Sequence, residues 1–394
     1  MQESTPFHSH PIEVEDALDV QAIERELNRL WTENAGASER NEEGAMLRAR
    51  VLNLLVYVTD EESLREVEEM LLDVAAMHPC RAVVMLAESA SADKDIEMHV
   101  STRCLLPEAG GRRLCCEQVN LRAGGRFTVE LPSASVPLLV ADLPVFLCWR
   151  APLLFEEQTF QNLIKAADRV IIDTAASLHS RDELSALARF LRQRSEAQTA
   201  LSDLNWTRLT AWRALLANFY DTPEHAKALE NLSHISIDFV GQKSAPGMVA
   251  PKALILAGWL ASRLGWRVMS AAETVAARSV ALERDGRRLS VEFREVEHMA
   301  VAQGGLARVE LKTESEARAS FIVMRAEDGR NLETRTDLLA DASTARVLAG
   351  GDKSEAQLLA AELEILCHDN IYEEAVIKAA EMADALSSGH TDWR

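Results

Sequence analysis

Tryptophan and arginine side chains are the clearest candidates for a functional role in this sequence. Five of the seven tryptophans fall between residues 149 and 266, and arginines lie close to several of them. An indole offers a large rigid surface and a guanidinium offers several donors, so both types are enriched where one protein anchors another. The candidate partner-binding residues are Trp149, Arg150, Trp206, Arg208, Trp212, Arg213, Trp259 and Trp266. Packing inside a core or between domains is the alternative for each tryptophan.

Residues that could bind a metal occur only in weak patterns. His8 and His10 have an H-x-H spacing, but residues 1–12 are better explained as a flexible lead-in. His78 and Cys80 could form half of a metal site, yet no matching half is evident. A turn between a helix and a strand explains this second pair better. We therefore expect no bound metal.

The motifs of the common cofactor-dependent and hydrolytic enzymes do not occur in the sequence. No G-x-G-x-x-G follows an expected strand, and there is no G-x-x-x-x-G-K-[ST], G-x-S-x-G or H-E-x-x-H. Cys115 and Cys116 are adjacent, which is not the C-x-x-C spacing of thioredoxin-type redox sites. This lowers the expectation of an enzyme without excluding one, and we expect no cofactor.

The elements around Trp149 and Arg150 predict an α/β domain. Residues 145–148 are an unbroken apolar run, as in a strand covered on both faces, and the run ends at Trp149 and Arg150. In open α/β sheets the carboxyl edge of such strands is where ligands and partners bind. Further strands are expected at 51–58, 81–88 and 169–173, a hairpin at 95–105 and 112–122, and helices at 61–77, 156–167 and 181–194. This order predicts a mostly parallel sheet flanked by helices.

The later sequence predicts an α+β domain. Asp203 is placed to cap a helix over 204–221, and a strand over 233–240 precedes a second helix over 251–266. Residues 275–338 alternate with a period of two between Asp-Gly and Gly-Gly turns, which predicts an antiparallel meander. Terminal helices are expected at 353–367 and 370–386.

Three segments follow from this pattern. Residues 1–46 form an acidic N-terminal segment with a helix at 19–33 and a polar linker at 34–46. Residues 47–200 form the α/β domain, and residues 201–394 form the C-terminal domain.

Composition and charge restrict the class of protein. Hydrophobic residues make up 47% of the chain, and 62 acidic against 42 basic residues leave a formal charge of −20. Such a surface repels phosphate backbones and anionic lipids, so we expect neither nucleic acid nor membrane as a partner. The sequence shows no signal peptide and no apolar run long enough to span a bilayer. A cytoplasmic location with reduced cysteines is expected.

Several sequence blocks, taken in order, resemble the OpcA family of glucose-6-phosphate dehydrogenase assembly proteins. The blocks are RVLNLLVYV at 50–58, HPCRAVV at 78–84, EQV at 117–119, DLPVFLCWR at 142–150, ADRVIID at 167–173, DLNWTRLTAWR at 203–213 and LAGWLASRLGW at 256–266. Cys148 departs from the pattern, because a second tryptophan is expected there in many relatives. The resemblance implies a non-catalytic activator that binds glucose-6-phosphate dehydrogenase, favours its active oligomer and promotes NADPH supply through the oxidative pentose phosphate pathway.

Two other hypotheses stay open at this point. The chain could be an enzyme or domain that binds a sugar phosphate or nucleotide at the carboxyl edge near Arg150. It could also be a purely structural scaffold, which would form a complex without a kinetic effect. If Trp149 and Arg150 anchor a partner, Arg150→Ala should weaken activation and leave folding intact. If they only pack the core, it should lower thermal stability instead.

Overall fold

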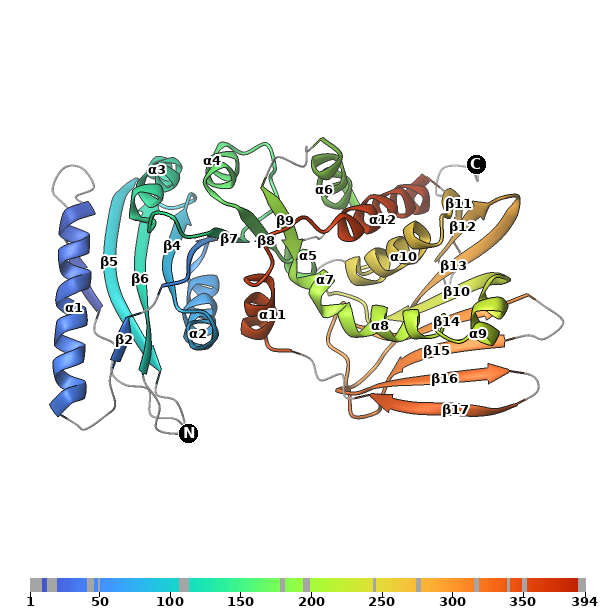
Figure 1. Ribbon diagram of the computed structural model, residues 1–394. Coiled ribbons are helices and arrows are strands. Elements are labelled where there is room, and N and C mark those ends of the chain that lie inside the picture. The colour runs from blue at the N-terminus through green and yellow to red at the C-terminus, as the bar shows by residue number, and fades with distance from the viewer. Residues whose placement is uncertain are drawn as a thin grey trace. The chain divides into compact units, whose positions relative to one another are not determined.

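A computed structural model describes most of the chain, and it divides into two compact units (Figure 1). The described residues are 9–12, 20–40, 46–48, 50–105, 113–177, 181–193, 199–243, 246–273, 278–314, 319–338, 341–348 and 353–388. Unit 1 comprises Met1–Asp173, Glu196–Ser202 and Ser354–His368, and unit 2 comprises Thr174–Ser195, Asp203–Lys353 and Asp369–Arg394.

The core of unit 1 is a mixed sheet in the order β1-β5-β6-β4-β3-β7-β8-β9, with β2 paired to β6. Its strands are β1 (Ser9–Ile12), β2 (Met46–Arg48), β3 (Leu52–Val58), β4 (Cys80–Glu88), β5 (Lys94–Leu105), β6 (Arg113–Gly124), β7 (Val145–Arg150), β8 (Arg169–Ile172) and β9 (Ala200–Asp203). Neighbours from β6 through β4, β3 and β7 to β8 are parallel, and the hairpin of β5 and β6 is antiparallel. The predicted α/β fold is confirmed.

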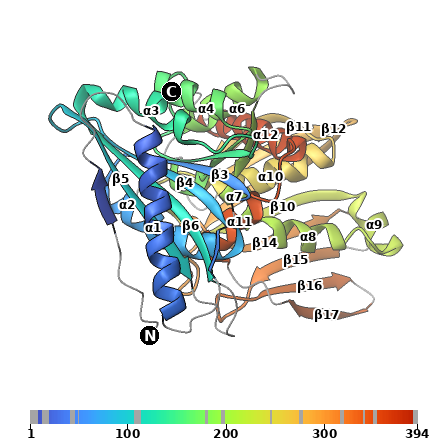
Figure 2. The same ribbon diagram turned by 60° about the vertical axis from the view of Figure 1, so that its left-hand side comes forward.

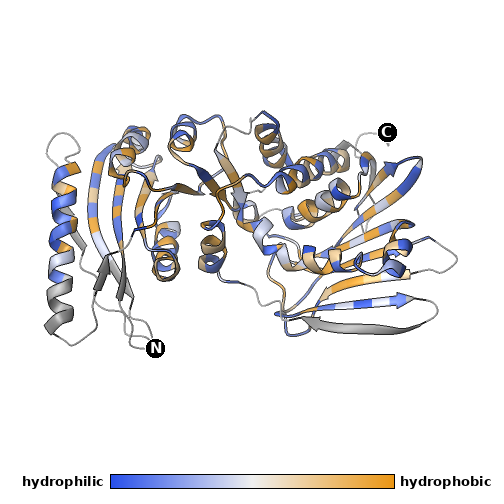
Figure 3. Cartoon of the chain, viewed as in Figure 1, coloured by the Kyte–Doolittle hydropathy of each residue, from blue (hydrophilic) through white to orange (hydrophobic). Residues whose placement is uncertain are grey.

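Helices cover both faces of this sheet. They are α1 (Val20–Arg40), α2 (Glu61–Met77), α3 (Leu131–Ser135), α4 (Gln158–Ala166) and α11 (Glu355–Glu362), with 3-10 turns η1 (Gly125–Glu130) and η2 (Val136–Leu138). Every residue of β3 is buried, as a doubly covered strand requires, whereas β5 and β6 alternate between hydrophobic and hydrophilic residues (Figure 3). Trp31 of α1 contacts Glu117 and Glu68 of α2 contacts Asn120. Since these β6 positions have opposite parity, α1 and α2 lie on opposite faces.

The core of unit 2 is a second sheet in the order β11-β12-β13-β10-β14-β15-β16-β17. Its strands are β10 (Leu232–Phe239), β11 (Arg267–Glu273), β12 (Arg278–Arg284), β13 (Arg287–Glu295), β14 (Leu306–Thr313), β15 (Ala319–Arg325), β16 (Leu332–Leu338) and β17 (Asp341–Leu348). All neighbours are antiparallel except β10 and β13, which are parallel. The predicted antiparallel strands are thus confirmed, but the single meander is wrong, because β10 lies between β13 and β14 and divides it into two antiparallel sets.

The helices of unit 2 lie on one side of this second sheet (Figures 1 and 2). They are α5 (Thr174–Ser177), α6 (Arg181–Gln193), α7 (Leu204–Arg208), α8 (Thr210–Asn218), α9 (Pro223–Leu229), α10 (Pro251–Arg263) and α12 (Asn370–Ser388). Helices α8, α9, α10 and α12 lie against the strands, and α6 packs on α12. Phe219 after α8 and His225 of α9 both contact Phe321 of β15. Gly258 lets α10 approach the backbone of α12, since a Cβ at this position would overlap Ala375 O.

Four details differ from the sequence predictions. Helix α1 continues to Arg40, so residues 34–40 are helical and not a linker. Residues 9–12 pair with β5 and are not part of a flexible lead-in. The helix expected over 204–221 divides at Leu209 into α7 and α8. Helix α11 ends at Glu362, five residues before the expected end. Such boundaries depend on capping and packing more than on hydrophobic period.

The two compact units do not follow the predicted boundaries at residues 46 and 200, because two segments lie in the other unit. Residues 174–195 belong to unit 2, and residues 354–368 belong to unit 1. The division into segments 1–46, 47–200 and 201–394 stays a prediction.

Candidate functional site

Trp149 lies inside unit 1, beneath α4. Its ring stacks on Tyr57 at 4.4 Å between centroids, and Phe160 meets it edge-on at 5.0 Å. The indole Nε1 donates to the Pro152 carbonyl at 3.1 Å, and only 1% of the residue is exposed. Stacking and a satisfied N–H account for this tryptophan as a core residue. The packing alternative therefore describes Trp149 in this structure.

Arg150 points to the opposite face of β7 and is paired. Its Nη2 lies 2.8 Å from Glu66 Oε2 of α2, and its Nη1 contacts Glu355 of α11. The side chain is 17% exposed. A ligand phosphate would have to displace both carboxylates, so Arg150 serves to hold α2 and α11 beside the sheet.

The same edge carries a helix start that disfavours phosphate. Asp60 caps α2, and its Oδ1 accepts from the Ser63 backbone N–H at 2.8 Å. That hydrogen bond lowers the pKa of Asp60. Glu61 and Glu62 follow in the first turn. Because dinucleotide-binding folds place a phosphate at the corresponding helix N-terminus, an acidic cap here works against the hypothesis of a nucleotide or sugar-phosphate site at this edge.

Replacing Arg150 with alanine is expected to lower stability modestly. The change frees two partly exposed carboxylates, and pairs of this kind contribute about 1 kcal/mol. Thermal unfolding followed by circular dichroism should show a fall in Tm of about 2–3 °C. Arg65→Ala on the exposed side of α2 is the matched control and should leave Tm almost unchanged. Equal effects for the two variants would show that the Arg150 pairs do not tie α2 to α11.

Trp206 and Arg213 are brought together in unit 2. The Arg213 guanidinium lies 3.4 Å from the centre of the Trp206 ring, which is a cation–π contact. The Trp206 Nε1 donates to Asp369 Oδ2 at 2.7 Å, and the ring is buried beside Tyr372. Trp206 therefore packs α7 against the start of α12.

The remaining predicted residues are distributed over unit 2. Trp212 is buried with Arg325 5.8 Å from its ring centre, and Trp266 is buried with Arg284 at 5.3 Å. Trp259, Arg208 and Arg213 are half-buried. Four of the predicted indoles are buried, so these three residues and Arg150 are the part of the predicted partner surface that keeps exposed area. Their contact with a partner stays a proposal.

Asp203 is confirmed as the cap of α7 and lies at the centre of a buried polar cluster. Its carboxylate accepts from the backbone N–H groups of Thr174 and Asn205, both at 2.9 Å, and from the Thr174 hydroxyl at 2.6 Å. The Tyr372 hydroxyl donates to it at 3.3 Å. These donors stabilise the buried carboxylate. Burial and the nearby Asp203 raise the pKa of Tyr372 well above its ordinary value.

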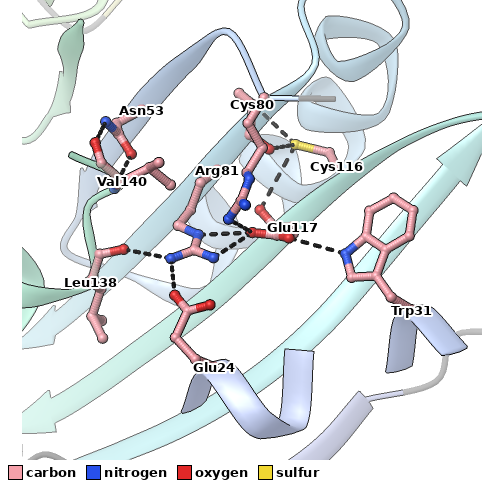
Figure 4. Close-up of polar contacts among 10 residues, drawn as sticks. Glu24, Trp31, Asn53, Cys80, Arg81, Cys116, Glu117, Leu138 and Val140 are labelled. Carbon is pink, nitrogen blue, oxygen red and sulfur yellow. Dashed lines mark hydrogen bonds and ion pairs between the residues drawn. The ribbon is translucent and has the colours of Figure 1, made fainter. Parts of the chain in front are cut away.

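A buried ion pair in unit 1 was not predicted from the sequence (Figure 4). Arg81 of β4 and Glu117 of β6 are register partners, with Nε and Nη2 of Arg81 2.8 Å and 2.6 Å from Glu117 Oε2. Arg81 also contacts Glu24 of α1 and donates to the Leu138 carbonyl. Trp31 Nε1 donates to the other Glu117 oxygen at 3.0 Å. The pair thus joins α1 to the sheet.

Cys80 and Cys116 lie beside this pair, with their sulfur atoms 2.9 Å apart. Both thiols are buried, and the hydrogen bond with Cys116 and burial raise the pKa of Cys80 well above its ordinary value. Burial also raises the pKa of Cys148 to about 12. These thiols behave as small hydrophobic groups in the folded protein.

Alkylation should distinguish these cysteines from Cys367, whose side chain is exposed. With iodoacetamide at pH 8, Cys367 should react within minutes. Cys80, Cys116 and Cys148 should react only after denaturation, because all three thiols are buried and the reagent cannot reach them. Peptide-resolved mass spectrometry measures each site. Rapid labelling of Cys148 in the native protein would contradict this account.

The described residues hold no group of three or more His, Cys, Asp or Glu side chains that could bind a metal. His78 lies 3.8 Å from Glu364, and His8 is outside the described residues. Within the same described part, no helix is both long and apolar enough to cross a membrane.

These features define an α/β protein of two units. Asp60 caps α2 at the position where the sheets of dinucleotide-binding folds bind a phosphate. Two family models match the chain: the "Glucose-6-phosphate dehydrogenase subunit N-terminal domain" over residues 72–191, and the corresponding C-terminal domain over residues 199–376. The chain belongs to the OpcA family.

Curated relatives agree with this assignment. The "Putative OxPP cycle protein OpcA" of Synechocystis is 31% identical over 198 residues, and that of Synechococcus elongatus is 34% identical over 200 residues. Each alignment covers 50% of this chain but only 39% and 42% of those proteins, respectively.

Among solved structures, the transcriptional regulator Gal80p of Kluyveromyces lactis is 8% identical, with a TM-score of 0.49 over 90% of this chain and 96% of that one. An oxidoreductase of Sinorhizobium meliloti is 12% identical, with a TM-score of 0.44 over 87% and 91%. Likenesses this distant carry no argument about function.

Proposed function

We propose that this protein is a non-catalytic effector that binds glucose-6-phosphate dehydrogenase, favours its active oligomer and raises its activity in the cytoplasm. The observation that carries the proposal is the match of both halves of the chain to models described as domains of a glucose-6-phosphate dehydrogenase subunit. The OxPP cycle in the relatives' names supports a role in the oxidative pentose phosphate pathway and hence in NADPH supply.

The sheet edge of unit 1 supports an effector over an enzyme. Asp60, Glu61 and Glu62 stand where a phosphate would bind, and Arg150 is already paired with Glu66 and Glu355. A protein with this edge has little affinity for a dinucleotide or sugar phosphate of its own. Nucleic acid and membrane surfaces are also poor partners for a chain of charge −20.

An effector acts by binding one state of its partner more tightly than another. Preference for the active oligomer of the dehydrogenase by about 1–3 kcal/mol would change substrate affinity about 5–150-fold. The free energy comes from the interface alone, so the effector needs no cofactor.

Two measurements on purified components test the proposal. Light scattering after size exclusion should detect a complex with the dehydrogenase of the same organism, larger than the dehydrogenase alone. Calorimetric titration of the isolated chain with glucose 6-phosphate and with NADP⁺ should give no binding heat. Binding of either ligand to the isolated chain would favour the enzyme hypothesis. A complex without any kinetic effect would favour the scaffold.

A further inference from the structure

The eight-stranded sheet of unit 2 has two chemically different faces. One face carries buried apolar side chains such as Ile237, Val291 and Val309, and α8 and α9 pack on it through Phe321. Neighbouring positions of opposite parity carry charged side chains with substantial exposure, reaching 48% for Lys312 and 54% for Arg335. We call this second surface the polar face.

The polar face is electrically balanced, unlike the rest of the chain. Residues that are strand partners lie on the same face, and residues next to a buried apolar position lie on the opposite face. By this rule the polar face has six basic residues: Arg267, Arg288, Arg294, Arg308, Lys312 and Arg335. The same register assigns six acidic residues: Asp238, Glu283, Glu292, Glu310, Glu333 and Asp337. Its net charge is therefore zero, whereas the whole chain carries −20.

Ion pairs hold many of these side chains in fixed positions. Arg294 Nε lies 2.7 Å from Asp238 Oδ1, and Glu310 accepts from Ser320 at 2.7 Å and pairs with Arg308 at 3.0 Å. The hydrogen bond from Ser320 and the nearby Arg308 lower the pKa of Glu310, although burial acts in the opposite direction. A surface of fixed charges loses little side-chain entropy when another protein covers it.

We propose that the polar face is the contact between two copies of this chain in a two-fold dimer. Two molecules of charge −20 repel each other over most of their surfaces, and a neutral face removes that repulsion where they meet. In a two-fold contact the same patch faces itself, so a mixed pattern of both signs can be self-complementary. This proposal is independent of the dehydrogenase.

The size of the face is sufficient for such a contact. The charged residues of the polar face lie within the seven strands β10 to β16. Strands about 4.8 Å apart, each with about six residues at ~3.4 Å per residue, give this face an area of about 600 Å² per copy. Two copies would bury about 1,200 Å² or more, which reaches the range of stable, specific interfaces.

Sedimentation velocity on the full chain tests the proposal. The wild-type protein at micromolar concentration should have twice the mass of the 43.5 kDa chain. The acidic double variant Lys312→Glu/Arg335→Glu and the basic double variant Glu333→Lys/Asp337→Lys should each sediment as monomers. An equimolar mixture of the two should again form dimers, because the altered charges are complementary.

Controls separate loss of the contact from loss of the fold. Arg189→Glu/Lys227→Glu makes the same charge change on exposed positions of α6 and α9 and should remain dimeric. Thermal melts establish that each variant is folded. A monomeric wild type, an acidic variant that stays dimeric, or a mixture that fails to dimerise would overturn the proposal. A monomeric wild type whose face variants lose binding to the dehydrogenase would assign the face to that partner instead.

Discussion

Replacing Arg81 with alanine is expected to destabilise unit 1 by about 3 kcal/mol, the lower end for breaking a buried ion pair, because the buried Glu117 carboxylate keeps Arg50, whose Nη1 lies 3.2 Å from Oε2. Arg81 is 3% exposed and Glu117 is fully buried. The change also removes a contact to Glu24 of α1 and a hydrogen bond to the Leu138 carbonyl. Denaturant unfolding monitored by tryptophan fluorescence should show the loss as a shift of the unfolding transition to lower denaturant.

Arg122→Ala is the matched control for Arg81→Ala. Arg122 lies on β6 and pairs with Glu61 and Glu88, but its side chain is 35% exposed. Such a pair contributes at most about 1 kcal/mol. The double variant Arg81→Met/Glu117→Leu should recover most of the lost stability, because it removes both buried charges together. Equal losses for Arg81→Ala and Arg122→Ala would contradict the assigned role of the buried pair.

The substitution Gly258→Ala is expected to destabilise unit 2 by about 3 kcal/mol, the upper end for overpacking of a tight contact. A Cβ at residue 258 would overlap the carbonyl oxygen of Ala375 and come within 2.8 Å of the Ala379 nitrogen. These are backbone atoms of α12 and cannot rotate away. Helix propensity alone predicts the opposite sign, a gain of about 1 kcal/mol for alanine in a helix.

The Tm measured by calorimetry shows whether Gly258→Ala destabilises or stabilises unit 2. Ser262→Ala, one turn further along α10, is the control and should change stability by no more than about 0.5 kcal/mol. A rise in Tm for Gly258→Ala would show that α10 and α12 are not in the close contact described here.

Apolar runs predicted many strands of the two sheets, but not β9, β11 or β17. The unbroken run of β7 and the alternating runs of β12–β16 are local patterns, and burial followed them closely. The cap at Asp203 was equally local, because one carboxylate before a helix satisfies its first N–H groups.

Long-range partners could not be read from local patterns. Arg81 and Glu117 are charged residues within apolar strands, which was a signal, but their pairing requires the register of β4 with β6. Helix α11 belongs to unit 1 although the sequence around it continues unit 2. Nothing in the local sequence of α11 predicts that it packs against α2.

The tryptophans illustrate the same limit of local patterns. Their spacing with arginines suits an interface as well as a core, since both environments favour large rings beside cations. The structure buries Trp149, Trp206, Trp212 and Trp266. Composition alone could not separate the two, because the distinction depends on what covers each ring.

The most direct test of the effector proposal is a titration of the dehydrogenase of the same organism with the purified full-length chain. Initial rates are measured over a range of glucose 6-phosphate concentrations at each amount of effector. We expect a saturable fall in apparent KM, of about 5–150-fold at full occupancy, together with an increase in the mass of the dehydrogenase complex. If apparent KM, kcat and complex mass all stay unchanged at saturating effector, the proposed function is wrong.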